Sequence, residues 1–346
     1  MSRTVADPGQ VGVIGRWFST ILALAALAAT LVLPAGSAAQ PPKRARVGML
    51  FLGSPATQAN RVTIVRDGLR DMGWVEGQNV AFEVRWAEGR VERASELATE
   101  LVRLNPDVIV TSGTPLIRAL QQATSTIPIV VQIMGDPVVA GFAASFARPG
   151  GNITGGAFQT VELNTKRLEL LTEMLPKLSR VAALLDPQVF TTRSVAADFR
   201  RVMEDAARAL KVKLQFLEVR GPDDFERAFE DARRGRAEAL LQIASGLFGA
   251  NRDRLAELTR RSQLPWACEI RESVVAGCLF SYGPDIDTMV RRVPFYVDRI
   301  LRGTKPGDLP IEQPTRFELI LNLRTAKALG LTIPQPILAR ADELIR

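Results

Sequence analysis

The strongest constraint on the fold is a regular alternation of short apolar runs and segments with helical periodicity, which extends from about residue 46 to residue 330. The apolar runs, for example 107–112 and 180–186, consist almost entirely of Val, Ile, Leu and Ala. Such runs are typical of strands that are buried on both faces, as in parallel sheets covered by helices on each side. The sequence therefore predicts an α/β fold.

The alternation divides into two similar blocks, about 47–156 and 157–283, without a close internal repeat. In the first block we expect strands at 46–52, 80–86, 107–112 and 127–134 and helices at 58–72, 90–104 and 115–123. In the second we expect strands at 180–186, 213–219, 238–243, 265–268 and 277–283 and helices at 164–175, 192–210, 222–234 and 250–262. The remaining elements are a helix at 285–302, a Pro- and Gly-rich linker at 303–315, a strand at 316–323 and a helix at 324–330.

The segment 129–156, IVVQIMGDPVVAGFAASFARPGGNITGG, breaks the alternation in an informative way. An apolar strand stops abruptly at Gly135-Asp136-Pro137, and small residues with a helical pattern follow at once. A Pro-Gly-Gly turn then leads to a second short apolar segment. We interpret the break as the end of a strand at a ligand cleft, followed by a crossing to the second block.

The N-terminal residues predict export. Arg3 and Arg16 precede an uncharged apolar run, 17–33, and small residues follow at Ser37 and Ala39. This is the pattern of a secretory signal peptide, residues 1–39, with cleavage near Ala39. The alternative is a retained membrane anchor, because the run has the minimum length of a spanning helix. No cysteine lies at the cleavage site, which argues against a lipoprotein.

Composition excludes several classes of function. The chain has no histidine, so the Ser-His-Asp and Cys-His arrangements are excluded and the commonest zinc ligand is missing. No dinucleotide or Walker-type phosphate motif is present. The net charge is +7, but the densest basic cluster, 233–236, lies among acidic residues, as on a solvated helix face. We therefore expect no metal, cofactor, catalytic residue or nucleic acid, although lysine or carboxylate chemistry stays possible.

The only cysteines are Cys268 and Cys278, on two strands that are expected to follow one another. In an exported protein, two cysteines can form a disulfide. Two buried reduced thiols are the alternative, because sequence does not give their geometry.

Polar loops at the predicted strand ends are the candidate site, because ligands of open α/β sheets bind outside the carboxyl ends of the strands. Thr114 and Asp136 lie where helix N-caps would lie, and free N–H groups at a helix start suit an anion such as a carboxylate. The candidates in the first block are Gly53, Ser54, Ser112, Gly113, Thr114, Gly135 and Asp136. The candidates in the second block are Asp186, Ser245, Glu269, Tyr282 and Asp285, whose acids could hold an ammonium. Helix capping alone is the alternative for these residues.

Five segments together resemble the ABC-transporter substrate-binding proteins of the tryptophan-binding-like group, over residues 46–336. The segments are GLRDMGWVEGQNVAFEVRWAEG, DVIVTSGTPLIRAL, IPIVVQIMGDPVVAGFAASFARPGGNITG, KRLELLTEMLPKLSRVAALLDP and KPGDLPIEQPTRFELILNLRTAKALGLTIP. The resemblance implies a type I periplasmic binding protein fold, in which two Rossmann-like lobes with parallel sheets are joined by three hinge crossings. The crossings would lie near 156–162, 280–285 and 303–316. The N-terminal lobe would comprise 46–157 plus 284–303, and the C-terminal lobe 158–283 plus 310–346.

The motifs of this group match the chain unevenly. Thr114-Pro115 and Asp136-Pro137 match its ligand loops. The chain has Asp186-Pro187 where Asn-Pro is common, Ala244-Ser245-Gly246 where Thr-Asp-Asn is common, and Glu269 where an Asp is common. These departures all lie on the cleft wall of the second lobe, so the sequence does not determine which solute is bound.

The resemblance predicts a monomeric, periplasmic solute receptor that is not an enzyme. It would close on an amino-acid-like solute or another small carboxylate and deliver the solute to an ABC permease in the inner membrane. A ligand-sensing protein that docks on a membrane receptor is one alternative. An exported α/β enzyme with a lysine or carboxylate base is another.

Overall fold

The structure is a computed structural model that describes residues 44–157 and 160–346. The predicted signal peptide, residues 1–39, lies outside the described residues, so cleavage near Ala39 stays a prediction. Residues 44–346 form one compact unit. Among the described helices, none is long and apolar enough to cross a membrane.

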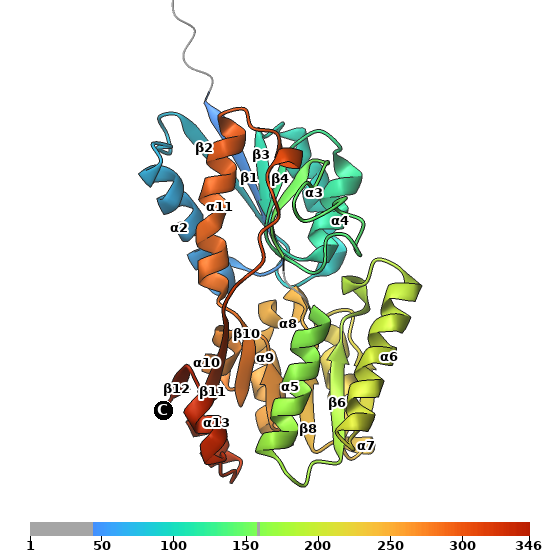
Figure 1. Cartoon of the computed structure of the whole chain (residues 1–346). Helices are drawn as coiled ribbons and strands as arrows, with labels where there is room; N and C mark the ends of the chain where they lie inside the picture. The colour runs from blue at the N-terminus through green and yellow to red at the C-terminus, as the bar shows by residue number, and fades with distance from the viewer. Residues whose placement is uncertain (1–43, 158–159) are drawn as a thin grey trace, which may run out of the picture. The chain divides into compact units, whose positions relative to one another are not determined.

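The first sheet has five parallel strands in the order β2-β1-β3-β4-β5. The strands are β1 (Ala45–Phe51), β2 (Val80–Trp86), β3 (Val108–Thr111), β4 (Ile129–Met134) and β5 (Ile153–Ala157). Side chains alternate along each strand, so Met49 packs towards α2 (Pro55–Asp71) and α11 (Ile286–Leu301). Leu50 packs on the other face with η1 (Val91–Arg93), α3 (Ala94–Arg103) and α4 (Thr114–Ala123) (Figure 1).

The second sheet has seven strands in the order β12-β11-β10-β9-β8-β6-β7. They are β6 (Arg180–Leu185), β7 (Lys213–Glu218), β8 (Ala239–Gln242), β9 (Trp266–Cys268), β10 (Phe280–Pro284), β11 (Phe317–Asn322) and β12 (Glu343–Ile345). One face packs against α5 (Thr160–Met174), α6 (Arg193–Ala209), α12 (Leu323–Ala328) and α13 (Gln335–Arg340). The helices on the other face are α7 (Phe225–Arg234), α8 (Gly246–Ala250), α9 (Arg252–Ser262) and α10 (Arg271–Ala276).

The chain passes between the two sheets three times, because β5 precedes α5, β10 precedes α11, and α11 precedes β11. The last passage contains η4 (Pro306–Asp308) and returns to the second sheet from the side of the first. As a result β11 runs antiparallel to β10, while every other strand pair is parallel. Two passages also pair with each other, since the Ala157 N–H donates to Glu312 O at 2.9 Å.

The predicted helix after Pro137 is wrong. Residues 135–151 form turns and bends, because Gly141 and Gly150 have positive φ angles of 74° and 77°, which a helix does not accommodate. Phe142 anchors this segment in the core. The predicted strands at 265–268 and 277–283 are present as β9 and β10, but the helix α10 between them was not predicted. Its six residues are too few to show helical periodicity.

Candidate functional site

A cavity of about 500 Å³ lies at the carboxyl ends of strands from both sheets. The loops after β1, β3 and β4 line it from the first lobe, and the loops after β6, β8 and β9 line it from the second. Seven of the predicted residues line this cavity: Ser112, Gly113, Thr114, Gly135, Asp136, Ser245 and Glu269. Five others do not: Gly53, Ser54, Asp186, Tyr282 and Asp285.

The loop after β3 brings the start of α4 to the cavity. Its N-cap is Gly113, not Thr114 as predicted, because the φ angle of 88° at this position favours glycine. Thr114 is the first residue of the helix and is 8% exposed. The first-turn N–H groups of a helix lack acceptors within the helix, so this wall suits the oxygen atoms of an anion.

Asp136 lies at the cavity and also caps the turn that follows it. Its Oδ1 accepts hydrogen bonds from the N–H groups of Val138 at 2.8 Å and Val139 at 3.0 Å. The predicted capping role is therefore present, but on a turn and not on a helix.

Gly53 and Ser54 do not line the cavity and bond to the first turn of α2, whose residues Thr57, Gln58 and Arg61 line it instead. The Gly53 N–H donates to Gln58 Oε1 and the Ser54 N–H donates to Thr57 Oγ1, both at 3.0 Å. Arg61, one helical turn beyond Thr57, lines the cavity. Arg61 was not among the predicted site residues, although its position beside Val62 and Val65 on a buried helix face was a signal.

Arg61 is buried and pairs with Glu272 of α10 at 4.0 Å, so the pair joins the two lobes. Burial lowers the pKa of its guanidinium, and Glu272, followed by Asp287 and Glu269, opposes this shift. Glu272 was also not predicted as a site residue, because it lies on α10, which is too short to show a helical pattern in the sequence.

Glu269 is the central acidic group of the second wall. Burial raises the pKa of its carboxyl group to about 7, although Arg167, the Ser245 N–H and Arg61 oppose the shift. Near neutral pH the group therefore both accepts and releases a proton readily. A cationic group of a solute would favour the charged form.

The two ends of the cavity differ in polarity. In the second sheet, β8 lies between β6 and β9, so the loops after β6 and β9 lie on opposite sides of the cavity. Mainly apolar side chains from α4, from α6 and from η2 (Pro187–Val189) with the residue after it line the first, including Leu116, Phe190 and Phe199, and Asp198 of α6 lies beside them. Arg61, Glu269 and Glu272 line the second, together with Arg252.

The two lobes touch on both sides of the cavity. On the apolar side, Arg118 Nη2 donates to Phe190 O at 3.2 Å and Thr191 Oγ1 donates to Val139 O at 3.5 Å. On the charged side, Arg252 Nη1 donates to Thr57 O at 3.4 Å.

The family of ABC transporter substrate binding proteins matches residues 49–345 of the chain. The chain belongs to this family. It is also similar to a tyrosine-binding protein of Clostridioides difficile, with 23% identity over 264 residues, 76% of this chain and 74% of that protein.

Two solved structures support the assignment of the fold. An ABC domain of Streptococcus pneumoniae in complex with L-Trp has a TM-score of 0.77 and 21% identity, over 88% of this chain and all of that one. A conserved domain protein of Vibrio cholerae has the same TM-score and 27% identity, over 87% of this chain and all of that one. The predicted type I periplasmic binding protein fold, with two α/β lobes and mostly parallel sheets, is confirmed.

In this ABC transporter substrate binding protein, Asp186 supports the cavity wall from behind. It is fully buried, and its carboxylate accepts the Ser245 hydroxyl at 2.7 Å and the Gln188 N–H at 2.9 Å. Ser245 in turn caps α8 through the Leu247 N–H. Burial raises the pKa of Asp186, and the bonds from Ser245 and Gln188 oppose the shift.

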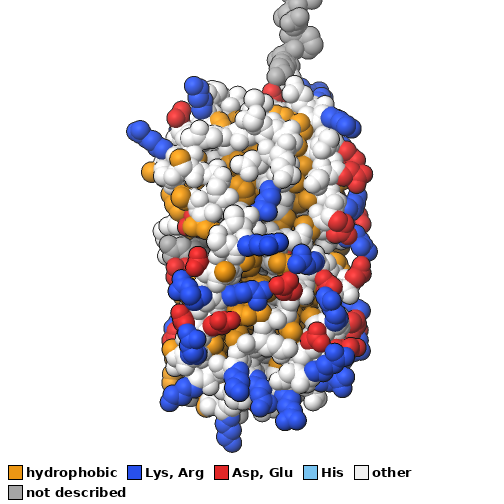
Figure 2. All heavy atoms as spheres, turned by 90° about the vertical axis from the view of Figure 1, so that its right-hand side faces the viewer, with side chains coloured by type: hydrophobic (Ala, Val, Ile, Leu, Met, Phe, Trp, Pro, Cys, Tyr) orange, Lys and Arg blue, Asp and Glu red, His pale blue; other side chains and the backbone are white. Residues whose placement is uncertain are grey.

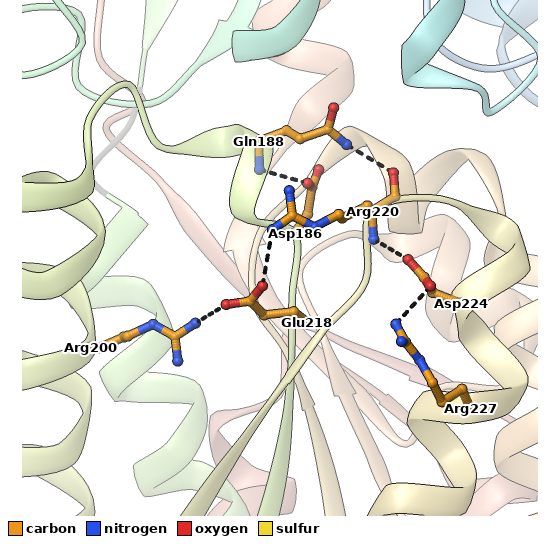
Figure 3. Close-up of polar contacts among 7 residues, drawn as sticks. All are labelled: Asp186, Gln188, Arg200, Glu218, Arg220, Asp224 and Arg227. Carbon is orange, nitrogen blue, oxygen red and sulfur yellow. Dashed lines mark hydrogen bonds and ion pairs between the residues drawn. The ribbon is translucent and has the colours of Figure 1, made fainter.

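A surface network continues from Asp186 along the edge of the sheet (Figure 3). Gln188 Nε2 donates to the Arg220 carbonyl at 2.8 Å, and Glu218 pairs with both Arg200 at 2.7 Å and Arg220 at 3.3 Å. This network accounts for the polar groups around Asp186 without a solute.

Tyr282 and Asp285 also serve the fold and do not reach the cavity. The Tyr282 carbonyl accepts a hydrogen bond from Arg167 Nε at 2.7 Å, and its ring lies 6.3 Å from the Phe317 ring. Asp285 caps α11 through the Thr288 N–H at 3.2 Å and hydroxyl at 2.6 Å. The capping alternative therefore describes Asp285.

We expect Asp186→Ala to lower the free energy of unfolding by about 1–3 kcal/mol, because it leaves the buried Ser245 hydroxyl without its acceptor. Asp186→Asn keeps one acceptor oxygen, so a smaller loss is expected. Urea unfolding measures both, and calorimetry should find solute affinity near wild type. Normal stability combined with lost affinity would instead show that Asp186 contributes directly to solute binding.

Proposed function

We propose that this protein is the periplasmic solute receptor of an ABC importer and that it closes on a small, amino-acid-like carboxylate. The observation that carries the proposal is the cavity between the lobes, where Arg61, Arg252, Glu269 and Glu272 lie at one end and mainly apolar side chains at the other. Binding sites for small molecules commonly combine an apolar lining with a few placed polar groups. Family membership supports the solute-binding role over an enzymatic one.

The placement of charge suggests how such a solute would lie. Its carboxylate would bind at the first turn of α4 or at Arg61, and its ammonium would pair with Glu269 or Asp136. Its apolar body would pack between Leu116 of α4 and Phe199 of α6. The names of the two relatives that mention tyrosine and L-Trp agree with a solute of this size and polarity.

Hinge closure would complete the site. The contacts of Arg118 and Arg252 with the opposite lobe would form only when the lobes approach, and a solute that contacts both walls would favour that state. Small-angle scattering of the protein with and without bound solute measures the compaction. An unchanged radius of gyration at saturating solute would count against closure.

A thermal-shift screen across amino acids, small carboxylates and nucleosides tests the class of solute. A ligand at 100 times its Kd stabilises the native state by about 2.7 kcal/mol, so binding should raise the melting temperature clearly. A hit among nucleosides and none among carboxylates would overturn the proposed class. Calorimetry of the best hit gives the reference affinity for variants.

Thr114→Ala and Asp136→Ala should each weaken solute binding by roughly 10–150-fold. A lost hydrogen bond to a charged group costs about 1.5–3 kcal/mol, and 1.4 kcal/mol is a factor of ten. If Asp136 only caps its turn and Thr114 only packs at the start of α4, the substitutions should instead cost about 1 kcal/mol of stability and leave affinity unchanged. Ser54→Ala is the matched control, because Ser54 lies beside the same cleft but its hydroxyl bonds to Thr57 in the first turn of α2.

Figure 2 shows how charged side chains are distributed over one face of the protein. Basic and acidic side chains are interspersed over much of this face, with hydrophobic side chains between them, and basic side chains gather at its lower end. The mixture over much of this face is typical of a solvated protein surface.

A further inference from the structure

The edge of the second sheet that faces away from the cavity carries a concentration of basic side chains. The parallel strands β6, β7, β8 and β9 all begin at this edge. The Lys213 N–H donates to Ser179 O at 2.8 Å and the Glu238 N–H donates to Arg180 O at 3.0 Å, so the loops that enter these strands lie side by side. Basic side chains gather at the lower end of the face in Figure 2, which is the end of the second lobe that points away from the cavity in Figure 1.

Four segments make up this edge, and we call them the basic edge. Each segment runs from the last three residues of α5, α6, α7 or α9 to the first residue of the strand that follows, and the four are 172–180, 207–213, 232–239 and 260–266. They contain ten basic and two acidic residues. Six of the basic side chains are exposed and form no ion pair with another described residue: Lys177, Lys211, Lys213, Arg233, Arg236 and Arg260.

The corresponding edge of the first sheet lacks this excess of positive charge. Its segments, defined in the same way, contain two basic and three acidic residues, and they are 69–80, 101–108 and 121–129. Arg44 and Arg46, which lie beside them, donate to the backbone carbonyls of Gly77 and Leu104. A basic residue in the last turn of a helix interacts favourably with the helix dipole. Because both edges contain such helix ends, the dipole does not account for the difference between them.

Two residues of the basic edge occupy backbone positions that favour glycine. Lys211 and Arg236 follow the ends of α6 and α7, with φ angles of 60° and 54°. Glycine is the usual residue at this position, because other side chains are strained at positive φ. Neither side chain has a polar partner among the described residues. The chain therefore places a positive charge where the fold alone favours a residue without a side chain.

The chemistry of the basic edge fits a surface of many phosphate groups. None of the exposed large hydrophobic side chains lies in its four segments, all of which the structure describes. Their only aromatic residue, Trp266, is buried. The edge thus has neither the apolar anchors of a specific protein interface nor rings on which bases could stack. What it offers is several flexible cations, which suit the closely spaced negative charges of anionic phospholipids.

We propose that the basic edge binds the phosphate headgroups of an anionic membrane surface. The edge lies at the opposite ends of the strands from the cavity, so this contact does not use the residues that line the cavity. Each lysine or arginine near such a surface strengthens binding by about fivefold. The attraction acts over about one Debye length, so it weakens as the ionic strength rises.

Vesicle sedimentation tests the proposal without any solute. The protein is the chain from residue 40 onward, which contains the compact unit 44–346 and omits the apolar run 17–33. Mixed vesicles of phosphatidylcholine and anionic phosphatidylglycerol are compared with vesicles of phosphatidylcholine alone. We expect the protein to sediment only with the anionic vesicles at about 50 mM salt and to remain in solution at about 500 mM salt.

Two triple variants separate the basic edge from net charge. Lys177→Gln, Lys211→Gln and Lys213→Gln together should weaken binding to the anionic vesicles by roughly 100-fold. The matched control removes the same charge from three exposed residues around the first sheet and should bind like the wild type: Arg148→Gln, Arg291→Gln and Lys305→Gln. Both variants should keep the melting temperature of the wild type, because the six side chains are exposed and form no ion pair with another described residue.

Failure to sediment with anionic vesicles at low salt would overturn the proposal, and so would equal losses in the two triple variants. Displacement by inorganic phosphate at constant ionic strength would assign the basic edge to free phosphate instead of lipid. Tighter binding to a DNA duplex than to the vesicles would identify nucleic acid as the partner and reject the membrane. Since no solute is present, each result is independent of the proposed function.

Discussion

Arg167→Ala is expected to lower the free energy of unfolding by about 2–6 kcal/mol, because two acceptors in the interior lose their donor at about 1–3 kcal/mol each. Arg167 has no exposed surface. Its Nε donates to Tyr282 O at 2.7 Å and its Nη1 to Asn164 Oδ1 at 2.5 Å. It thereby joins α5, which follows the first passage between the lobes, to β10, which precedes the second.

The loss would have an electrostatic part as well as a hydrogen-bonding part. Burial lowers the pKa of Arg167, and the Glu269 carboxylate makes the largest opposing contribution. Without the guanidinium, Glu269 would lose the strongest of the interactions that favour its charged form. Glu269→Gln in the Arg167→Ala background should therefore recover part of the lost stability.

Urea unfolding at neutral pH measures these variants. Arg201→Ala is the control, because Arg201 pairs with Asp198 on the surface at 3.2 Å and should contribute less than about 1 kcal/mol. A loss for Arg167→Ala as small as that of the control would show that the buried guanidinium is dispensable to the fold.

Glu269→Gln is expected to change how stability depends on pH. The pKa of Glu269 is raised from 4.5 to about 7 in the folded, solute-free protein, so the folded state binds this proton more tightly than the unfolded state. Its contribution is therefore fully present below pH 4.5 and is lost as the pH rises through 7. At about 1.4 kcal/mol per pH unit, the loss amounts to about 3 kcal/mol.

The glutamine variant cannot lose this contribution. We expect its stability relative to wild type to rise by about 3 kcal/mol between pH 4.5 and pH 8, measured by urea unfolding without solute. Glu238→Gln is the control of opposite sign, because the Ser179 N–H lowers the pKa of Glu238. Its stability relative to wild type should change only below pH 4.5. Parallel pH profiles for wild type and Glu269→Gln would contradict the shifted titration.

The α/β class and most elements could be predicted from sequence because they depend on local patterns. Nearly continuous apolar runs predict buried parallel strands, and the loops that end β3 and β4 could be located as strand ends. Local signals also failed locally: the small residues after Pro137 suggested a helix, but Gly141 and Gly150 adopt positive φ angles. The six residues of α10 were too few to show a period.

Which polar side chains line the cavity was decided by tertiary structure. Asp186 and Glu269 both follow strands of the second sheet, yet the Ser245 hydroxyl, 59 residues from Asp186, occupies its carboxylate. Arg61 and Glu272 come together only because α2 and α10 meet across the lobes. The positions at which the strands end could be predicted from the alternation of strands and helices, because this pattern depends on residues that are close together in the sequence. The partner of each buried charge depends on residues far away in sequence, because an uncompensated buried charge is costly and its compensation is set by packing.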